Sequence, residues 1–289
     1  MRKTILSLLW AVVWVGAAEA QPAPDPVAKD VTVLSFKIHY LESGVGRPVI
    51  LLHGVGADGS RWQANMQSLS KGFHVFAVDQ IGFGQSDKPL ANYHIGMLSD
   101  FLIAFMKAVG LEKASLIGSS MGAMVAEYTA VHHPDSVEKL VLADGADFCT
   151  FPNSIFPANP HLRQIANGAS RDETREYFRF LIHDKSLVTE PVIENNWILR
   201  LKSSYAIGKI IETSGKIGCV TDNEMARVKA PTLIVWGKYD ALFDSSNADR
   251  LERNISGSRK VILDKAGHLG QLEQAGDFNR LVGQFLEAP

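Results

Sequence analysis

The sequence predicts an α/β fold in which a mostly parallel, doubly wound sheet carries helices on both faces and an inserted helical cap. Short apolar runs typical of buried strands alternate with helical patterns along most of the chain. A glycine-rich turn at residues 118–122 joins one such run to a helix. Between residues 148 and 220 the alternation stops and helical patterns predominate, which indicates the insertion.

Each element is predicted from its hydrophobic pattern. The runs expected to form strands are 31–38, 38–41, 48–52, 73–78, 114–117, 140–143, 232–236 and 260–263. Helical spacing of apolar residues predicts helices at 62–69, 95–109, after Ser120 and at 277–286, and within the insertion at 171–183 and 191–201. We therefore expect a core made of residues 31–147 and 221–289, a linker at 21–30 and a helical cap at 148–220. The cap would close over the carboxyl ends of the strands, where such sheets bind ligands, although helices packed beside the sheet would give the same pattern.

The first twenty residues have the pattern of a secretory signal. Two basic residues precede a short apolar run, and Ala18-Glu19-Ala20 follows as a cleavage site. The apolar run is short for a bilayer span, and no cysteine follows it to carry a lipid. We expect cleavage after Ala20 and export to the periplasm or the extracellular space, without a stable membrane anchor. An uncleaved anchor is the alternative.

Composition excludes several classes of function. With 46% hydrophobic residues, the 289-residue chain can bury a large core. Without residues 1–20 it has 27 basic and 30 acidic residues, a net charge of −3, which does not favour a nucleic-acid partner. Cys149 and Cys219 lack the spacing of a zinc site, so they either pair as a disulfide or stay free. No metal or organic cofactor is predicted, and the oligomeric state is left open.

The turn at residues 118–122 predicts a nucleophile. Gly118-Ser119-Ser120-Met121-Gly122 has the form G-x-S-x-G between an apolar run and a helix. In that context the serine lies at the apex of a strained turn, and the flanking glycines leave room for it. The N–H of Met121, at the start of the helix, can donate a hydrogen bond to an oxyanion. Ser120 is therefore the candidate nucleophile.

A serine hydroxyl needs a base, and the base needs an acid to orient it. Asp240 and His268 each follow a predicted strand, so both are expected at the sheet edge that carries Ser120. Asp244 and Asp144 are alternative acids. The N–H of Val55, in the loop after strand 48–52, is the second predicted oxyanion donor.

Together these residues resemble the α/β-hydrolase superfamily from about Val31 to Leu286. The resemblance rests on His53-Gly54, residues 79–86, Gly118 to Gly122, residues 236–240 and Gly267-His268. It implies an α/β-hydrolase fold, with nucleophile, acid and base in that order along the chain. A serine at the elbow differs from the aspartate of epoxide hydrolases and haloalkane dehalogenases, and favours an acyl-enzyme.

Two subfamilies compete for the substrate. Cap segments 173–177 and 184–190 are similar to meta-cleavage-product hydrolases, which cut carbon–carbon bonds in dienoates. That family usually has an Asn before the serine, a cap Arg that binds the substrate carboxylate and a Trp after the histidine. Here the matching positions are Ser119, Asn196 and Leu269, which we take as candidate substrate-pocket residues. Segments 236–238 and 245–249 are instead similar to monoacylglycerol-type lipases and carboxylesterases.

Loss of the acid-binding residues favours an exported serine hydrolase that cleaves carboxylic esters, with medium acyl chains that fit an apolar pocket under the cap. The alternative within the same class is a carbon–carbon bond hydrolase of the meta-cleavage type. A non-catalytic ligand-binding protein on a hydrolase scaffold is the alternative from a different class, but such a protein has no need of a complete triad.

Overall fold

A single mixed sheet forms the centre of the molecule. The computed structural model describes residues 24–145, 159–168, 170–214 and 216–289. Within them the strands are β1 (Val27–Val33), β2 (Phe36–Ser43), β3 (Arg47–Leu52), β4 (Phe73–Val78), β5 (Ala114–Ser119), β6 (Val137–Ala143), β7 (Thr232–Gly237) and β8 (Arg259–Leu263). Their order in the sheet is β1-β2-β4-β3-β5-β6-β7-β8, with β2 antiparallel to β1 and β4 and all other pairs parallel.

Helices cover both faces of this sheet. The core helices are η1 (Gly59–Trp62), α1 (Gln63–Leu69), α2 (Ile95–Ala108), α3 (Met121–His132), η2 (Pro134–Ser136), α9 (Asp222–Met225), α10 (Ser246–Asn254), α11 (Gly270–Glu273) and α12 (Ala275–Glu287). Side chains alternate across the strands: Ile50 and Leu52 pack on the side of α2 and α3, while Val49 and Leu51 pack on the side of α1 and α12. Because both faces are covered, the central strands are fully buried, which confirms the predicted α/β-hydrolase fold class.

The first strand begins earlier than predicted. Residues 27–30, expected to belong to a linker, are part of β1, and the predicted strands 31–38 and 38–41 are instead one hairpin of β1 and β2 turning at residues 34–35. β1 is an edge strand, so its outer residues, including Lys29 and Asp30, remain exposed. Strands with a solvated face lack the continuous apolar run that was used to locate the other strands.

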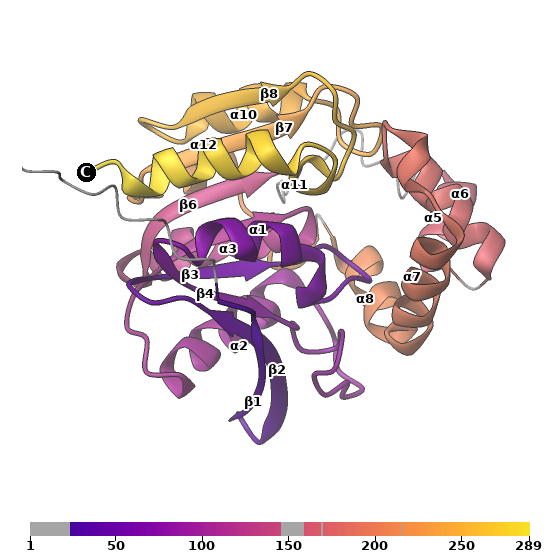
Figure 1. Cartoon of the computed structure of the whole chain (residues 1–289), viewed down its shortest axis with the longest axis horizontal. Helices are drawn as coiled ribbons and strands as arrows, with labels where there is room; N and C mark the ends of the chain where they lie inside the picture. Colours follow the sequence, from indigo (N-terminus) through magenta and orange to yellow (C-terminus); the bar gives the residue numbers. More distant parts are fainter. Residues whose placement is uncertain (1–23, 146–158, 169, 215) are drawn as a thin grey trace, which may run out of the picture.

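Further helices lie between β6 and β7 in sequence and at one end of the sheet in space (Figure 1). They are α5 (Pro160–Asn167), α6 (Arg171–Leu181), η3 (Lys185–Leu187), α7 (Glu190–Lys202) and α8 (Ser204–Thr213). We call α5 to α8 the cap. Its helices carry local start signals, such as the capping box of Ser170 and Glu173 at the start of α6.

Some predicted features lie outside the described residues. The signal peptide and its cleavage site at Ala20 fall within residues 1–23, and Cys149 falls within residues 146–158. Cys219 is disulfide-bonded in the structure. Within the described ranges, no helix combines the length and the apolarity required to cross a bilayer.

Candidate active site

The turn at Ser120 has the strained geometry predicted for a nucleophile. Ser120 lies between the end of β5 and the start of α3, with φ 54° and ψ −121°. Residues other than glycine rarely adopt this backbone conformation. A Cβ on Gly118 would lie 2.1 Å from the carbonyl oxygen of Gly122, and one on Gly122 would lie 2.0 Å from that of Leu52. Only glycine fits at either position, so the local sequence holds the Ser120 hydroxyl above the sheet edge.

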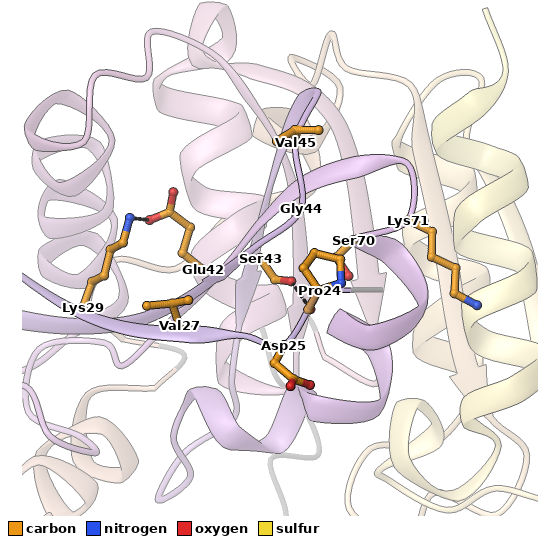
Figure 2. A pocket seen from close by; sticks show the side chains of 10 residues that line it. All are labelled: Pro24, Asp25, Val27, Lys29, Glu42, Ser43, Gly44, Val45, Ser70 and Lys71. Carbon is orange, nitrogen blue, oxygen red and sulfur yellow. Dashed lines mark hydrogen bonds and ion pairs between the residues drawn. The ribbon is translucent and has the colours of Figure 1, made fainter. Parts of the chain in front are cut away.

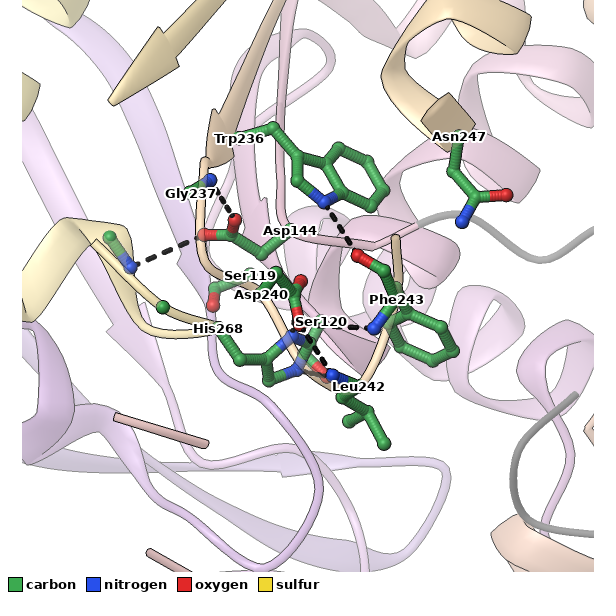
Figure 3. Close-up of polar contacts among 12 residues, drawn as sticks. Ser119, Ser120, Asp144, Trp236, Gly237, Asp240, Leu242, Phe243, Asn247 and His268 are labelled. Atoms are coloured by element: carbon green, nitrogen blue, oxygen red, sulfur yellow. Dashed lines mark hydrogen bonds and ion pairs between the residues drawn. The ribbon is translucent and has the colours of Figure 1, made fainter. Parts of the chain in front are cut away.

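Ser120, His268 and Asp240 are brought together by hydrogen bonds (Figure 3). Ser120 Oγ lies 2.8 Å from His268 Nε2, and His268 Nδ1 lies 2.8 Å from Asp240 Oδ2. Asp240 Oδ1 also accepts hydrogen bonds from the N–H groups of Leu242 and Phe243, at 2.8 and 3.0 Å. With Nδ1–H donating to Asp240, Nε2 of the imidazole is free to accept the serine proton. This arrangement can activate a serine for attack on a carbonyl carbon.

The other two candidate acids have different positions. Asp244 Oδ1 accepts a hydrogen bond from the N–H of Ser246 at 2.9 Å, at the start of α10. Asp144 Oδ1 accepts from the N–H of Gly237 at 2.6 Å, and its Oδ2 accepts from that of Gly270 at 3.3 Å (Figure 3). Burial, followed by repulsion from Asp240, raises the pKa of Asp144 well above its usual value. Asp144 therefore connects the end of β7 to the start of α11, and Asp240, not Asp144, orients the imidazole.

The predicted oxyanion donors flank the nucleophile. Met121 is the first residue of α3, where the backbone N–H has no acceptor within the helix. Val55 and Gly54 line a small pocket together with Ser120 and His268. A Cβ on Gly54 would lie 3.1 Å from the Cβ of Ser120, so this loop passes close to the nucleophile.

A buried histidine holds the oxyanion loop. His53 Nδ1 donates to the carbonyl of Gly54 at 2.8 Å, and its Nε2 accepts from the N–H of Gln80 at 3.1 Å. Burial lowers the pKa of His53, which favours the neutral ring that these two bonds require. His53 therefore orders the loop, since both of its ring nitrogens bond to backbone groups, and the base beside Ser120 is His268.

The cap contacts the loop that carries the base. The N–H of His268 donates to the carbonyl of Leu181, the last residue of α6, at 2.8 Å. Glu273 accepts hydrogen bonds from the N–H groups of His183 and Asp184 with one oxygen, and from that of Gly267 with the other. Sequence reasoning missed Glu273, because nothing local marks a carboxylate that binds two segments distant in sequence.

Two arginines that the sequence did not single out line the same pocket. Arg200, from α7, is 1% exposed, and its Nε and Nη2 atoms have no hydrogen-bond partner among the described residues. Its guanidinium lies over the ring of Tyr177, and Nη1 reaches the carbonyl of Val55 only at 3.4 Å. Arg61, from η1, lies close enough for the two cations to repel, and burial lowers its pKa to about 10. The pocket is therefore positively charged and can bind an anion.

The three candidate pocket residues have separate environments. Leu269 lines the pocket beside Ser120. Ser119 is buried, and its hydroxyl accepts a hydrogen bond from Gln271 Nε2 at 2.9 Å. Asn196 accepts a hydrogen bond from Arg61 Nη2 and lines an outer groove instead of the pocket. The expectation that the site lacks a cation for an acidic substrate is therefore wrong, because Arg200 lies one helical turn beyond Asn196 and reaches the pocket from there.

A separate cavity lies at one edge of the sheet, away from these residues. It measures about 520 Å³ and lies beside β1 and β2, with Lys29 and Glu42 paired across it at 2.7 Å (Figure 2). It borders Pro24, the first described residue, and contains none of the candidate site residues. No cluster of three His, Cys, Asp or Glu residues able to hold a metal occurs among the described residues.

Comparisons with known proteins agree with this geometry. A family model described as alpha/beta hydrolase fold matches residues 47–169. The chain is similar to a 2-hydroxy-6-oxononadienedioate/2-hydroxy-6-oxononatrienedioate hydrolase of Comamonas testosteroni, with 28% identity over 87% of this chain and 92% of the relative. It is also similar to the structure of a meta-cleavage product hydrolase from Pseudomonas fluorescens IP01, with 26% identity, TM-score 0.77 and 89% and 97% coverage. The structure of a bacterial membrane phospholipase A, 23% identical with TM-score 0.79 and 91% and 86% coverage, shares the fold.

Proposed function

We propose that this chain, which belongs to the α/β-hydrolase superfamily and is a hydrolase, cleaves a carbon–carbon bond beside a ketone in an acidic substrate of the 2-hydroxy-6-oxo-dienoate class. This reverses the order of the two hypotheses drawn from the sequence. The names of the similar hydrolases support carbon–carbon cleavage, and the charge of the pocket supports an acidic substrate.

The observation that carries the proposal is the unpaired guanidinium of Arg200. A buried cation is costly unless an anion compensates it, and none of the described carboxylates forms an ion pair with Arg200. Its Nε and Nη2 atoms have no partner, and a guanidinium can bind a carboxylate through two such N–H groups. A carboxylate of the substrate would supply the missing partner beside Ser120.

The proposed mechanism uses the triad in the ordinary order. Ser120 Oγ attacks the ketone carbon while its proton passes to His268 Nε2, and Asp240 stabilises the imidazolium. The N–H groups of Val55 and Met121 bind the developing oxyanion. The substrate reacts as its 2-oxo tautomer, in which the carbon next to the ketone is tetrahedral. The bond from that carbon to the ketone carbon then breaks, the carbonyl re-forms as the acyl ester of Ser120, and the electron pair is delocalised into the unsaturated 2-oxo acid. His268 returns the proton to the dienolate that leaves. Water, activated by His268, releases the acyl group from Ser120.

The carboxylate at Arg200 has a role in this step. A carbon leaving group is far less stable than an alkoxide, so its electron pair must be delocalised. The positive charge of Arg200 lowers the energy of the conjugated acid as it becomes more negative, and it does so in a pocket from which water is largely excluded.

Hydrolysis of carboxylic esters is the second candidate function. It is favoured by positions 119 and 269, where serine and leucine stand instead of the Asn and Trp usual in meta-cleavage-product hydrolases. Ser119 Oγ accepts a hydrogen bond from Gln271 Nε2, and Ser119 is not among the residues that line the pocket. An ester requires less stabilisation of its leaving group than a dienoate.

A direct comparison tests the two candidates. Purified protein is assayed with a 2-hydroxy-6-oxo-6-phenyl-dienoate, followed by loss of its visible absorbance, and with a series of p-nitrophenyl esters. We expect a higher kcat/KM for the dienoate, and no turnover of either substrate by Ser120→Ala. Turnover of esters alone would replace the first candidate by the second. A folded protein that turns over neither and is not labelled by a fluorophosphonate would support a ligand-binding protein.

A further inference from the structure

An outer groove of about 490 Å³ lies next to the catalytic pocket, between the cap and the core. On the cap side, α7 turns Val192, Asn196 and Leu199 toward it, at the spacing that places residues on one face of a helix. On the core side, Ala64 of α1 and Leu272 of α11 line it. Most of the exposed wall surface is apolar. The polar residues of the wall are Asp58, Ser60, Arg61, Gln63, Asn195 and Asn196.

Arg61 lines both the groove and the catalytic pocket. Its guanidinium hydrogen-bonds the side-chain oxygen of Asn196 across the gap between core and cap, and lies 5.4 Å from the ring centroid of Phe178. Asn196 is in turn fixed by a hydrogen bond of 2.7 Å from its Nδ2 to the carbonyl of Val192. The Arg61–Asn196 contact thus separates the outer groove from the catalytic pocket.

The catalytic pocket is too small to hold a substrate as it stands. Its volume is about 30 Å³, enough for a water molecule or two, whereas pockets for organic ligands measure roughly 300–1,000 Å³. A substrate with its carbonyl at Ser120 must therefore displace part of the wall. Arg61 is the wall residue that separates the pocket from the groove. Its hydrogen bond is to a neutral amide, and Arg200 repels it while Asp58 attracts it.

We propose that the outer groove is a substrate subsite, in which the hydrocarbon part of the molecule that acylates Ser120 lies after Arg61 has moved aside. The groove is continuous with the catalytic pocket at Arg61, which lines both, and most of its exposed wall is apolar. The catalytic pocket alone is too small for the substrate, so the hydrocarbon part of the substrate is the molecule expected in the groove. Burial of the hydrocarbon against Val192, Leu199 and Leu272 supplies the binding free energy. The proposal rests on Ser120 being the nucleophile of the proposed function.

Two fluorophosphonates that differ only in chain length test the proposal, because neither requires knowledge of the natural substrate. In both reactions Ser120 Oγ bonds to phosphorus, fluoride leaves and the hydroxyl proton passes to His268. One probe carries a methyl group on phosphorus and the other a dodecyl chain. The readout is the second-order rate constant for labelling of Ser120, measured by intact mass on the full chain.

The variants compared are Leu199→Trp, which fills the groove, and Ile198→Trp, a matched control on the neighbouring residue. Ile198 is 37% exposed and does not line the groove. In the wild type the dodecyl probe should react faster than the methyl probe. Leu199→Trp should lower the dodecyl-to-methyl ratio of rate constants by about tenfold or more, because the methylene groups of the dodecyl chain could no longer be buried in the groove. Ile198→Trp should keep the wild-type ratio.

The outcomes separate this proposal from the proposed function. An unchanged ratio in Leu199→Trp, or an equal fall of the ratio in both variants, would overturn the subsite while leaving Ser120 as the nucleophile. Failure of the methyl probe to label folded wild-type protein at Ser120 would instead overturn the nucleophile, and with it the proposed function.

Discussion

Replacing Arg200 by methionine should change stability and substrate binding in opposite directions. Methionine has a similar length and no charge, so it removes the buried cation without leaving a large cavity. The wild-type side chain is 1% exposed. Within the part of the chain that the structure describes, its one hydrogen bond is at 3.4 Å, and its Nε and Nη2 atoms have no partner. Burial lowers the pKa of this guanidinium, because the charged form loses hydration there.

The two magnitudes follow from that environment. Replacing buried ionic groups by apolar ones of similar size is neutral or stabilising by about 1–4 kcal/mol, so we expect a rise of about 1–2 kcal/mol in the free energy of unfolding. Hydrogen bonds to charged groups contribute about 1.5–3 kcal/mol, so loss of the carboxylate contact should raise KM for a dienoate roughly 10- to 150-fold. Turnover of a small neutral ester should change far less.

Urea unfolding and steady-state kinetics on the same preparations measure both effects. Arg171→Met is the matched control in the cap, because Arg171 is exposed and pairs with Glu194 at the surface, where ion pairs contribute little. Arg200→Lys keeps the charge but not the two parallel donors, and should lie between wild type and Arg200→Met in KM. A destabilised Arg200→Met with equal losses on acidic and neutral substrates would refute the reasoning, because Arg200 would then be a structural residue.

Three further predictions concern the fold, its pH dependence and the amino terminus. Gly122→Ala should destabilise the protein by more than about 2 kcal/mol, because the new Cβ would lie 2.0 Å from a backbone oxygen of β3. Gly283→Ala in α12 should instead raise stability by roughly 0.5–1 kcal/mol, because the new Cβ would have no atom within 4 Å. Thermal unfolding of the two variants measures both effects. Burial, followed by repulsion from the Asp240 carboxylate, raises the folded-state pKa of Asp144, so the folded protein binds more protons than the unfolded one. The free energy of unfolding should therefore fall as the pH rises above about 4. Asp144→Asn should remove that fall, and equal pH dependence of stability in the two proteins would contradict the prediction. Cleavage after Ala20 predicts that the exported protein begins at residue 21, and amino-terminal sequencing of the periplasmic or secreted form would show an intact leader if the prediction is wrong.

The sequence located the residues whose positions follow from local rules. Ser120 is fixed by glycines that leave no room for side chains, so its place in the fold can be read from five consecutive residues. Asp240 and His268 follow strands, and the carboxyl ends of parallel strands meet at one edge of the sheet. The sequence favoured Asp240 over Asp144 as the acid, but both follow neighbouring strands. The direction of the two side chains in the structure makes Asp240 the partner of the imidazole.

The residues that decide the substrate were not predictable from the sequence. Arg200 lies in the last turn of α7, where a basic residue is ordinarily exposed and stabilises the end of the helix, so its pattern indicates a surface position. The resemblance to meta-cleavage-product hydrolases matched their carboxylate-binding arginine to Asn196, which lines the outer groove. Arg61 likewise precedes the buried Trp62 without any signal that it faces the cap.

The sequence by itself therefore determined the α/β fold and brought a serine, a histidine and an acid to one edge of the sheet, because strand periodicity and steric limits at glycine act over a few residues. Only the tertiary structure decided which acid the imidazole meets and what charge the pocket carries. Those properties depend on how the cap packs on the core, and that packing buries Arg200 beside Ser120 from a helix some eighty residues away in the chain.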